Sequence, residues 1–222
     1  MKIRDRVLGI VEGLKKEYPQ AECSLNYDEP YQLLFATRLS AQCTDARVNI
    51  VTKELYSRYR TLREIAECDI AELERIVHPC GVFRMKARDI RASANVLIEK
   101  FGGEVPDTME ELLTLPGVGR KTANLILGDI FGKPAVVADT HCIRISNKLG
   151  LCNSRDPKQV ELRLKEIVPP DEQNMLCHRF VWHGRAVCSA RNPKCEECSI
   201  AKFCKTYEKT VNKPGTRDKE TI

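Results

Sequence analysis

Four cysteines near the carboxyl end of the sequence have the spacing of a metal or cluster site. They form the pattern C-x6-C-x2-C-x5-C within residues 188–204, a polar segment in which four unrelated cysteines would be improbable. A zinc site usually combines two short chelating turns, and only one such turn is present here. A single loop around a compact cofactor favours a [4Fe-4S] cluster, although spacing alone does not exclude structural zinc. The candidate ligands are Cys188, Cys195, Cys198 and Cys204.

A lysine after a glycine-rich turn is the best candidate for covalent chemistry. Lys121 follows the run Leu115-Pro-Gly-Val-Gly-Arg120, which has the composition of a tight turn between two helices. Backbone N–H groups at the start of the second helix can bind a phosphate. A lysine amine held beside the phosphates of a nucleic acid is positioned to react with it and form a Schiff base. The alternative is a solvated charge after an ordinary turn.

A carboxylate follows this turn in the sequence. Asp139 could take up a proton or stabilise a positively charged sugar while the lysine reacts. It could equally cap a helix that begins at Thr140. Both roles require an ionised carboxylate, so they are compatible. Basic residues surround the cysteines, and Arg191 and Lys194 among them could grip phosphates or simply favour solubility.

The elements that must position these groups are predicted to be helices. Apolar residues at helical spacing predict helices over 3–17 and 30–39, a third after Thr44, short helices from residues 62 and 70, and a long helix to about residue 101. Met85 is expected to face the core from that long helix. Only residues 135–138 resemble a strand. Later helices are predicted to end near residues 149, 168 and 187, and the tail from Thr206 is expected to fray.

The glycine-rich turn is predicted to join two helices. Thr108 and Glu111 have the spacing of a capping box, which predicts a short helix from about Met109 to Leu115. Pro116 blocks its continuation. Gly117 and Gly119 permit backbone angles that other residues avoid, and a second helix follows them.

The composition suits a globular protein that binds a polyanion. The chain has 222 residues, 42% of them hydrophobic, and a formal net charge of +5, which fits one domain or two small ones. We expect no signal peptide and no membrane span. The 11 cysteines then indicate a reducing cytoplasm, where clustered cysteines bind metal. The cysteines outside the cluster are interpreted mostly as small core residues: Cys23, Cys43, Cys68, Cys80, Cys142, Cys152 and Cys177.

Taken together, these segments resemble the endonuclease III family of helix–hairpin–helix DNA glycosylases with an iron–sulfur cluster. The hairpin at 115–124, the Val-Ala-Asp139-Thr-His141 segment and the cysteine loop carry the resemblance, which extends from the first helix to Cys204. Leu-Ser-Ala-Gln42-Cys-Thr-Asp is similar to the family loop that enters the space behind a flipped base. Gly-Val82-Phe is similar to the loop that carries an apolar wedge, although valine is smaller than the leucine expected there.

The resemblance implies an all-α fold in two domains with DNA in the cleft between them. A six-helix barrel would span residues 23–134 and contain the helix–hairpin–helix at 109–131, and a discontinuous iron–sulfur domain would combine 1–22 with 135–222. Lys121 would be the nucleophile and Asp139 its partner. The partner would be double-stranded DNA with a damaged base or an abasic site, bound by a monomer in the cytoplasm or at the nucleoid. Implied DNA contacts are Gln42, Val82, Gly117, Val118, Gly119, His141, Arg191 and Lys194.

The activity implied is base excision repair by a combined glycosylase and AP lyase. Such an enzyme would remove oxidised pyrimidines through a lysine Schiff base and cut the strand by β-elimination 3′ to the lesion. An adenine-specific relative would have a further C-terminal domain, whereas we expect this chain to stop soon after the cluster. A mismatch uracil or thymine glycosylase and a non-catalytic helix–hairpin–helix protein are the alternatives. Monofunctional mismatch thymine glycosylases of the family lack the lysine, whereas this chain has Lys121. A non-catalytic protein that only grips phosphates would require no carboxylate such as Asp139. The combined glycosylase and lyase is therefore the leading interpretation.

Overall fold

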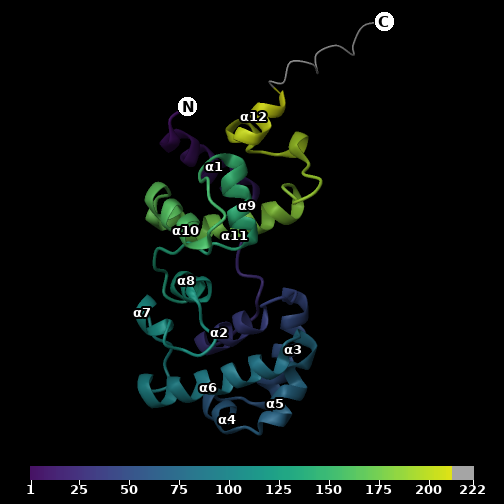
Figure 1. Cartoon of the computed structure of the whole chain (residues 1–222), viewed down its shortest axis with the longest axis vertical. Coiled ribbons are helices and arrows are strands. Elements are labelled where there is room, and N and C mark those ends of the chain that lie inside the picture. Colours follow the sequence, from purple (N-terminus) through teal and green to yellow (C-terminus); the bar gives the residue numbers. More distant parts are fainter. Residues whose placement is uncertain (212–222) are drawn as a thin grey trace, which may run out of the picture. The chain divides into compact units, whose positions relative to one another are not determined.

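Helices joined by loops make up the described part of the chain (Figure 1). The computed structural model describes residues 1–211, within which no β-strand occurs, so the predicted all-α fold is confirmed. The strand candidate at 135–138 is buried but belongs to no regular element. No described helix is long and apolar enough to cross a membrane. The α-helices are α1 (Ile3–Glu17), α2 (Pro30–Leu39), α3 (Asp45–Arg58), α4 (Leu62–Glu67), α5 (Ile70–Val77), α6 (Phe83–Phe101), α7 (Met109–Leu112), α8 (Arg120–Asp129), α9 (Thr140–Leu149), α10 (Pro157–Ile167), α11 (Gln173–Ala186) and α12 (Lys205–Val211).

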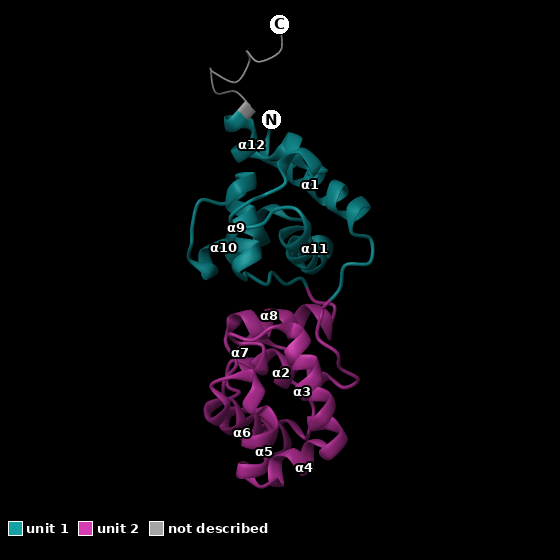
Figure 2. Ribbon diagram, turned by 90° about the vertical axis from the view of Figure 1, so that its right-hand side faces the viewer, with its two compact units in different colours: residues 1–22, 134–222 teal, residues 23–133 magenta. Residues whose placement is uncertain are grey.

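The chain divides into two compact units, which Figure 2 shows in different colours. Residues 23–133 form one unit, which contains α2 to α8. Residues 1–22 and 134–211 belong to the other, which contains α1, α9 to α12 and the cysteine loop. Two short 3-10 helices, η3 (Cys195–Glu197) and η4 (Ala201–Phe203), lie within that loop. The second unit is therefore assembled from both ends of the sequence.

Helix α6 is a central packing element of the unit formed by residues 23–133. It contacts α2, α4 and α5, and it buries Ile90 and Leu97 almost completely. The prediction that Met85 faces the core is wrong, because this side chain is 55% exposed. The buried position is one residue further on, where Lys86 is only 1% exposed. A lysine is rarely buried, because removing its charge from water is costly, so sequence periodicity assigns it to the surface by default.

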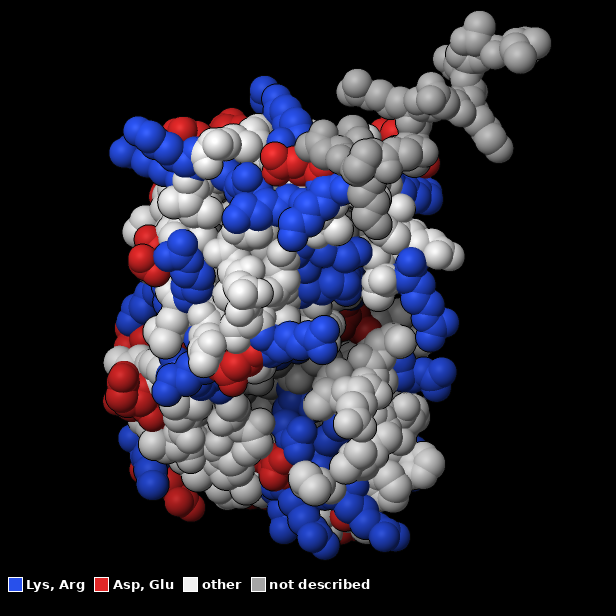
Figure 3. All heavy atoms as spheres, turned by 45° about the horizontal axis from the view of Figure 1, so that its top comes forward, with Lys and Arg blue, Asp and Glu red and all other residues white. Residues whose placement is uncertain are grey.

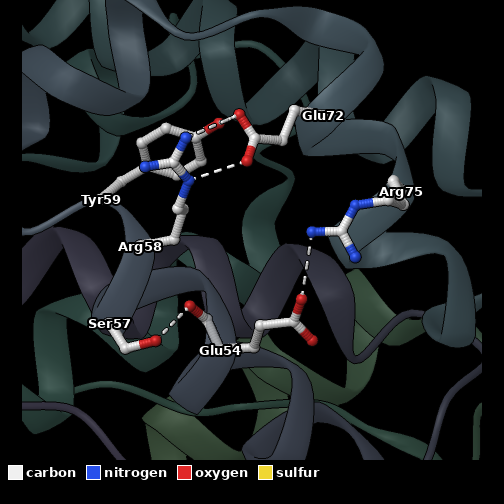
Figure 4. A network of polar contacts seen from close by, with 6 residues as sticks. All are labelled: Glu54, Ser57, Arg58, Tyr59, Glu72 and Arg75. Atoms are coloured by element: carbon white, nitrogen blue, oxygen red, sulfur yellow. Dashed lines mark hydrogen bonds and ion pairs between the residues drawn. The ribbon is translucent and has the colours of Figure 1, made fainter.

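A polar network joins α3 to α5 at the surface of the same unit (Figure 4). Arg58 pairs with Glu72 through two contacts, Nε to Oε1 at 2.7 Å and Nη2 to Oε2 at 3.2 Å. The Tyr59 hydroxyl donates to Glu72 Oε2 at 3.0 Å, and Arg75 Nη2 donates to Glu54 Oε1 at 3.4 Å. The hydrogen bond from Arg58 is the main reason why the pKa of Glu72 is lower than usual. Exposed ion pairs contribute little stability, so the network mainly fixes how the two helices are oriented.

The first helix and the cysteine loop pack together although they lie at opposite ends of the sequence. Gly9 and Gly13 are four residues apart, so they lie on one face of α1. A Cβ at Gly9 would overlap the Phe203 ring, and a Cβ at Gly13 would lie 2.5 Å from Ile200 Cγ2. Arg6 is buried beside them, and its Nη1 donates to the Phe203 carbonyl oxygen at 3.0 Å. The two glycines thus create the space in which the loop's apolar side chains are buried.

Helix α7 is shorter than predicted, because it ends at Leu112 and not at Leu115. The Thr108 hydroxyl accepts the Glu111 N–H at 3.2 Å, as a capping box requires. The Glu111 carboxylate, however, accepts from the Thr108 hydroxyl at 2.7 Å, where the capping box predicts a bond from the backbone N–H of Thr108. The N–H groups of Thr114 and Leu115 bond three residues back, to Glu111 and Leu112, which tightens the chain into a turn before Pro116.

Several cysteines that stand alone in the sequence are close together in space. Cys142 lies near Cys177, and Cys80 lies near Cys43. All are free thiols. The interpretation as core residues is confirmed for the four buried ones, which are Cys68, Cys80, Cys142 and Cys177.

The segment from Lys205 to Val211 is helical, so the expectation of fraying from Thr206 is wrong for these residues. Helix α12 contacts α9, and the Thr206 hydroxyl donates to the Lys148 carbonyl oxygen at 2.9 Å. These contacts stabilise a helix in a segment whose polar composition alone predicts no ordered structure. The remainder of that predicted tail lies outside the described residues.

Candidate functional site

The glycine-rich turn lies between α7 and α8, as predicted, but its two glycines differ. Gly117 has a φ of +75°, which side chains other than glycine rarely adopt. Gly119 has φ −107° and ψ 175°, an extended conformation open to any residue. The prediction that both glycines supply special backbone angles is therefore wrong for Gly119. A Cβ there would meet nothing within 4 Å, so the structure leaves space above this residue.

Side chains from α2 and α6 hold the turn in place. Arg38 on α2 and Asp89 on α6 form an ion pair, with Nη2 and Oδ2 separated by 2.6 Å. A Cβ at Gly117 would lie 2.7 Å from both Arg38 Nε and Asp89 Oδ2. Ser93, one turn further along α6, donates its hydroxyl to the Pro116 carbonyl oxygen at 2.8 Å. The turn can approach α6 this closely because Gly117 has no side chain.

Lys121 lies in the first turn of α8 and is exposed to solvent. Among the described residues, no side chain or carbonyl group forms a hydrogen bond or ion pair with its amine. The opposite face of α8 is anchored by buried Ala123, Ile126 and Leu127. The fold therefore fixes the helix and presents an unengaged amine at its positive N-terminal end.

Asp139 is the N-cap of α9, so the predicted capping role is confirmed. Its Oδ1 accepts the Cys142 N–H at 2.7 Å. Within the described residues its carboxylate makes no other hydrogen bond, and the residue is half-buried. It follows the buried segment 135–138, which fixes where the helix begins. Lys121 and Asp139 belong to different units.

Helix α9 is tied to the cysteine loop through His141 and Arg144. Arg144 Nη2 lies 3.2 Å from His141 Nδ1 and donates to the Cys188 carbonyl oxygen at 2.9 Å. At the other end of the loop, Cys204 Sγ lies 3.4 Å from the Lys148 carbonyl oxygen. The helix that carries Asp139 at its start thus contacts both ends of the loop.

The four cysteines of the loop line one cavity of about 60 Å³. Apolar Ile145, Leu149 and Val187 form part of its wall. Among the residues described, no three His, Cys, Asp or Glu side chains converge on one point that a single ion would occupy. The four cysteines instead line one shared space, which fits a compact cluster bound by all four.

The environment of the thiols also fits a cationic cofactor. Cys198 Sγ lies 3.6 Å from His183 Nε2, and His183 Nδ1 lies 3.2 Å from the Tyr18 hydroxyl. Burial raises the pKa of the Cys198 thiol to about 11 and also raises that of Cys188. Thiolates in such a place need a nearby positive charge, and iron ions supply it when bound.

Gln42 and Val82 are the non-glycine residues with positive φ in the described part of the chain, at +57° and +47°. Both are exposed, Val82 by 54%. A β-branched residue in this conformation is strained, and such strain is typical of functional positions. No sequence pattern predicted it, yet it falls on the two residues for which the resemblance implied contact with the base stack.

Two predicted phosphate contacts at the cysteine loop are exposed, but they differ in their partners. Lys194 pairs with Glu197 at 3.6 Å, whereas Arg191 is exposed without a hydrogen bond or ion pair to the described residues.

Val118, in the glycine-rich turn, is half-buried, and its N–H donates to the Leu115 carbonyl oxygen at 3.1 Å. The prediction that the N–H groups of this turn point outward is therefore wrong for Val118. On the face drawn in Figure 3, Lys and Arg side chains cover more of the surface than Asp and Glu.

Sequence reasoning missed the residues beneath the site, namely Lys86, Arg38, Asp89 and Ser93. The spacing of Lys86, Asp89 and Ser93 along α6 could have revealed three of them. These residues share one helix face, and their polar side chains lie next to the buried apolar residues Ala87, Ile90 and Ala94.

Comparisons with known proteins agree with this geometry. Residues 35–170 match the profile of the HhH-GPD superfamily base excision DNA repair proteins, and residues 188–204 match the iron-sulfur binding domain of endonuclease III. Endonuclease III of Synechocystis sp. is 50% identical over 203 residues, which cover 90% of this chain and 92% of that protein. Endonuclease III of Bacillus subtilis is 41% identical over 197 residues, with 88% and 90% covered. A solved structure of a trapped endonuclease III–DNA covalent intermediate has a TM-score of 0.88 at 40% identity, and the match covers 95% of this chain and 100% of that one.

Proposed function

Because this chain belongs to the endonuclease III family of base excision repair enzymes, we propose that Lys121 is its nucleophile and Asp139 the carboxylate that assists it. As a member of this family, the chain is a DNA glycosylase and AP lyase that binds DNA and has a [4Fe-4S] cluster as its cofactor. The observation that carries the assignment of the nucleophile is the exposed amine of Lys121, which no described residue engages, at the start of α8.

The proposed reaction begins with attack of the Lys121 amine on the sugar C1′. The bond between C1′ and the base breaks, and the base leaves with its electron pair and a proton. An ordinary lysine is protonated at neutral pH, so its proton must be removed before attack. An ionised Asp139 can accept a proton or stabilise the cationic sugar, and its capping bond to Cys142 favours the ionised form.

The sugar ring then opens, because the C1′–O4′ bond breaks and O4′ takes up a proton, which leaves a protonated Schiff base between Lys121 and C1′. Strand cleavage follows from this Schiff base. Its positive charge acidifies the C2′ proton, and loss of that proton expels the phosphate at the 3′ position. Water then releases the lysine from the remaining sugar. The substrate class we propose is duplex DNA with an oxidised pyrimidine, bound by a monomer that acts on chromosomal DNA in the cytoplasm. Removal of uracil or thymine from mismatches is the alternative to be tested.

The proposed reaction requires the base to leave the stack, which costs a few kcal/mol. We assign Gln42 and Val82 to the space that the base vacates. Gln42 offers a donor and an acceptor to the unpaired partner base, and Val82 offers an apolar wedge. Their exposure and left-handed backbones support this assignment, since both side chains are accessible from solvent and both backbones are held in an unusual conformation.

Phosphate contacts are assigned to the backbone of the turn at Gly117 and Gly119, with His141, Arg191 and Lys194 as further contacts. Val118, whose N–H is bonded to Leu115, would contact the DNA through its other atoms. The open space above Gly119 supports close approach of a phosphate to the backbone. The cluster is assigned to Cys188, Cys195, Cys198 and Cys204, which would hold it as a structural element. Their contacts with α9 support that role, because the helix that Asp139 caps contacts both ends of the cysteine loop, at Cys188 and at Cys204.

Borohydride trapping tests the proposal, because it converts a transient Schiff base into a stable covalent adduct. Oligonucleotides would carry an oxidised pyrimidine, an abasic site, a G·T mismatch or an A·8-oxoguanine pair. We expect the unaltered protein to form adducts with the first two substrates. The variant Lys121→Gln should form no adduct with any of them, although it should still bind DNA. Lys100→Gln, a change at an exposed lysine of α6, is the matched control. An adduct formed by Lys121→Gln would identify another amine as the nucleophile.

A further inference from the structure

Lys86 is a buried lysine whose three donors are all used. Its Nζ donates to the carbonyl oxygens of Leu39 at 2.8 Å, Ala41 at 2.7 Å and Cys80 at 2.8 Å. The side chain is 1% exposed. An ammonium group has three N–H donors, so none remains for a substrate. Lys86 is therefore excluded as a second nucleophile, and its function must lie in what it holds.

The three acceptors belong to the two loops that carry the strained residues. Leu39 ends α2, and Ala41 directly precedes Gln42. Cys80 lies two residues before Val82, and the backbone N–H of Lys86 donates to the Val82 carbonyl oxygen at 3.2 Å. A single residue at the start of α6 is thus bonded to both loops. Cys43 and Cys80, which lie near each other, also belong to these two loops.

The strain and the buried charge have a common explanation. A left-handed backbone at a residue other than glycine persists only where the surrounding contacts enforce it. Three carbonyl groups turned inward toward one ammonium group supply such contacts on both loops at once. Burying an ammonium group costs several kcal/mol unless hydrogen bonds offset it. A leucine or methionine would fill the same space at lower cost but would leave the carbonyl groups without donors.

We propose that Lys86 is a positioning residue that couples the two loops, so that Gln42 and Val82 enter the base stack in a fixed relation to each other. This inference rests on the proposed role of those two residues. Lys86 touches neither the base nor the sugar, so it acts before the chemical steps. The bonds that Lys121 forms and breaks do not depend on it.

The test compares two substrates under single-turnover conditions with Lys86→Met, which keeps the length of the side chain and removes the donors. We expect excision of an oxidised pyrimidine from duplex DNA to slow by about tenfold or more, and cleavage at an abasic site by less than about threefold, because no base remains to be extruded there. A 2-aminopurine opposite the lesion should show a smaller rise in fluorescence. Lys86→Arg, which keeps a cationic donor, should recover part of the duplex rate. Lys100→Met is the matched control on the same helix.

The outcomes separate this inference from the proposed function. Equal slowing on both substrates would overturn it, because loss of folded protein affects both alike. An unchanged duplex rate for Lys86→Met, while Gln42→Ala and Val82→Gly slow that rate, would overturn the coupling alone. Unchanged duplex rates for those two variants would overturn the proposed role of the loops and the coupling with it.

Hydrogen exchange on the unaltered protein decides the matter if Lys86→Met does not fold. The amides of Cys43 and Gly81 are hydrogen-bonded within the two loops, to the carbonyl groups of Ser40 and His78. Coupled loops should protect both amides with the same opening free energy. Two clearly different values would show that the loops move independently and would overturn the proposal.

Discussion

At the scale of single residues, Val82 shows how the fold and the proposed function make opposite demands. Its φ of +47° is unfavourable for a β-branched side chain. A left-handed conformation costs about 1–2 kcal/mol for a residue with a Cβ, and glycine avoids that cost. We therefore expect Val82→Gly to raise the unfolding temperature by roughly 2–8 °C, although it should remove the wedge and slow excision from duplex DNA.

Thermal unfolding and single-turnover excision measure the two effects on Val82→Gly. Met85→Gly is the control, because Met85 is also exposed but lies in the regular first turn of α6. Glycine in a helix costs about 1 kcal/mol relative to alanine, so this variant should lose stability. A lower unfolding temperature for Val82→Gly would show that its backbone is not strained.

Asp139 has an observed role as a helix cap and a proposed role in catalysis, and substitution can separate the two. Asparagine is as good an N-cap as aspartate, so Asp139→Asn should change stability by less than about 0.5 kcal/mol. It removes the negative charge, and we expect base excision to slow by about 100-fold or more, which is the range for loss of acid–base assistance. Equilibrium binding to lesion-containing DNA should change little.

Asp156→Asn is the matched control for the cap. Asp156 caps α10 by accepting the Gln159 N–H at 2.8 Å, so the same change is made at an N-cap with no proposed chemistry. This variant should retain full activity. If Asp139→Asn loses binding and excision in equal measure, Asp139 is a cap alone.

The sequence alone identified residues with unusual chemistry, but it did not predict which residues have a strained backbone or an unusually buried charge. Lys121 and the cysteines are conspicuous because of their types and spacing. The strain at Gln42 and the burial of Lys86 arise from tertiary contacts, here between loops about 40 positions apart in the chain. No local pattern encodes such contacts.

At the scale of elements, the hairpin turn predicts different outcomes at its two glycines. Gly117→Ala places a Cβ 2.7 Å from the Arg38–Asp89 ion pair at a φ of +75°, so it should lower stability by about 1–3 kcal/mol. Gly119→Ser fits the backbone and supplies a favourable N-cap to α8, so stability should be kept or increased. Its side chain occupies the space above the turn, so binding to damaged and undamaged duplexes should weaken alike.

Thermal unfolding and equilibrium DNA binding distinguish the two glycines. Gly132→Ser is a control for the unfolding measurement at a glycine of positive φ whose Cβ would meet nothing within 4 Å. A selective loss of binding to one lesion in Gly119→Ser would contradict a role in backbone phosphate contact.

Helix positions were predicted well wherever apolar periodicity and caps agreed. Helices α1 and α2 span the predicted residues. Helix α1 has a clear apolar face, whereas α2 is an apolar segment buried on most sides that begins at Pro30 and is followed by the polar Ser40. The prediction was wrong for α7, where the end depends on how the turn packs against α6. It was also wrong for α12, which owes its order to contacts with α9.

At the scale of the whole molecule, the cysteine loop and the first helix should depend on each other. Gly13→Val would collide with Ile200, which is fully buried. We expect purified Gly13→Val to contain less iron than the roughly four atoms per chain of an intact cluster and to unfold at lower temperature. Glu12→Val places the same residue on the exposed side of α1 and should retain iron. Full iron content in Gly13→Val would show that the loop forms without this contact.

Loss of the cluster should act on catalysis through α9. Cys198→Ser removes one ligand from a loop whose own apolar core is small, and we expect loss of the brown colour and of iron. Because Arg144 and Lys148 connect α9 to this loop, excision should fall with the iron content. Normal excision by iron-free protein would contradict the structural role.

The joining of the two chain ends in one unit could be predicted only through the family resemblance, since no pattern in α1 marks Ile200 or Phe203 as its partner.

The contact between Gly13 and Ile200 also sets an order of events during synthesis. The two residues are 187 positions apart, and a ribosome adds about 5–20 residues each second, so the first helix waits roughly 10–40 s for the loop that covers it. The unit formed by residues 23–133 has emerged completely by then and can fold while the helix is still uncovered. A nascent chain therefore keeps this face of its first helix uncovered until Ile200 has been added, and only then can the unit that contains the cysteine loop be completed.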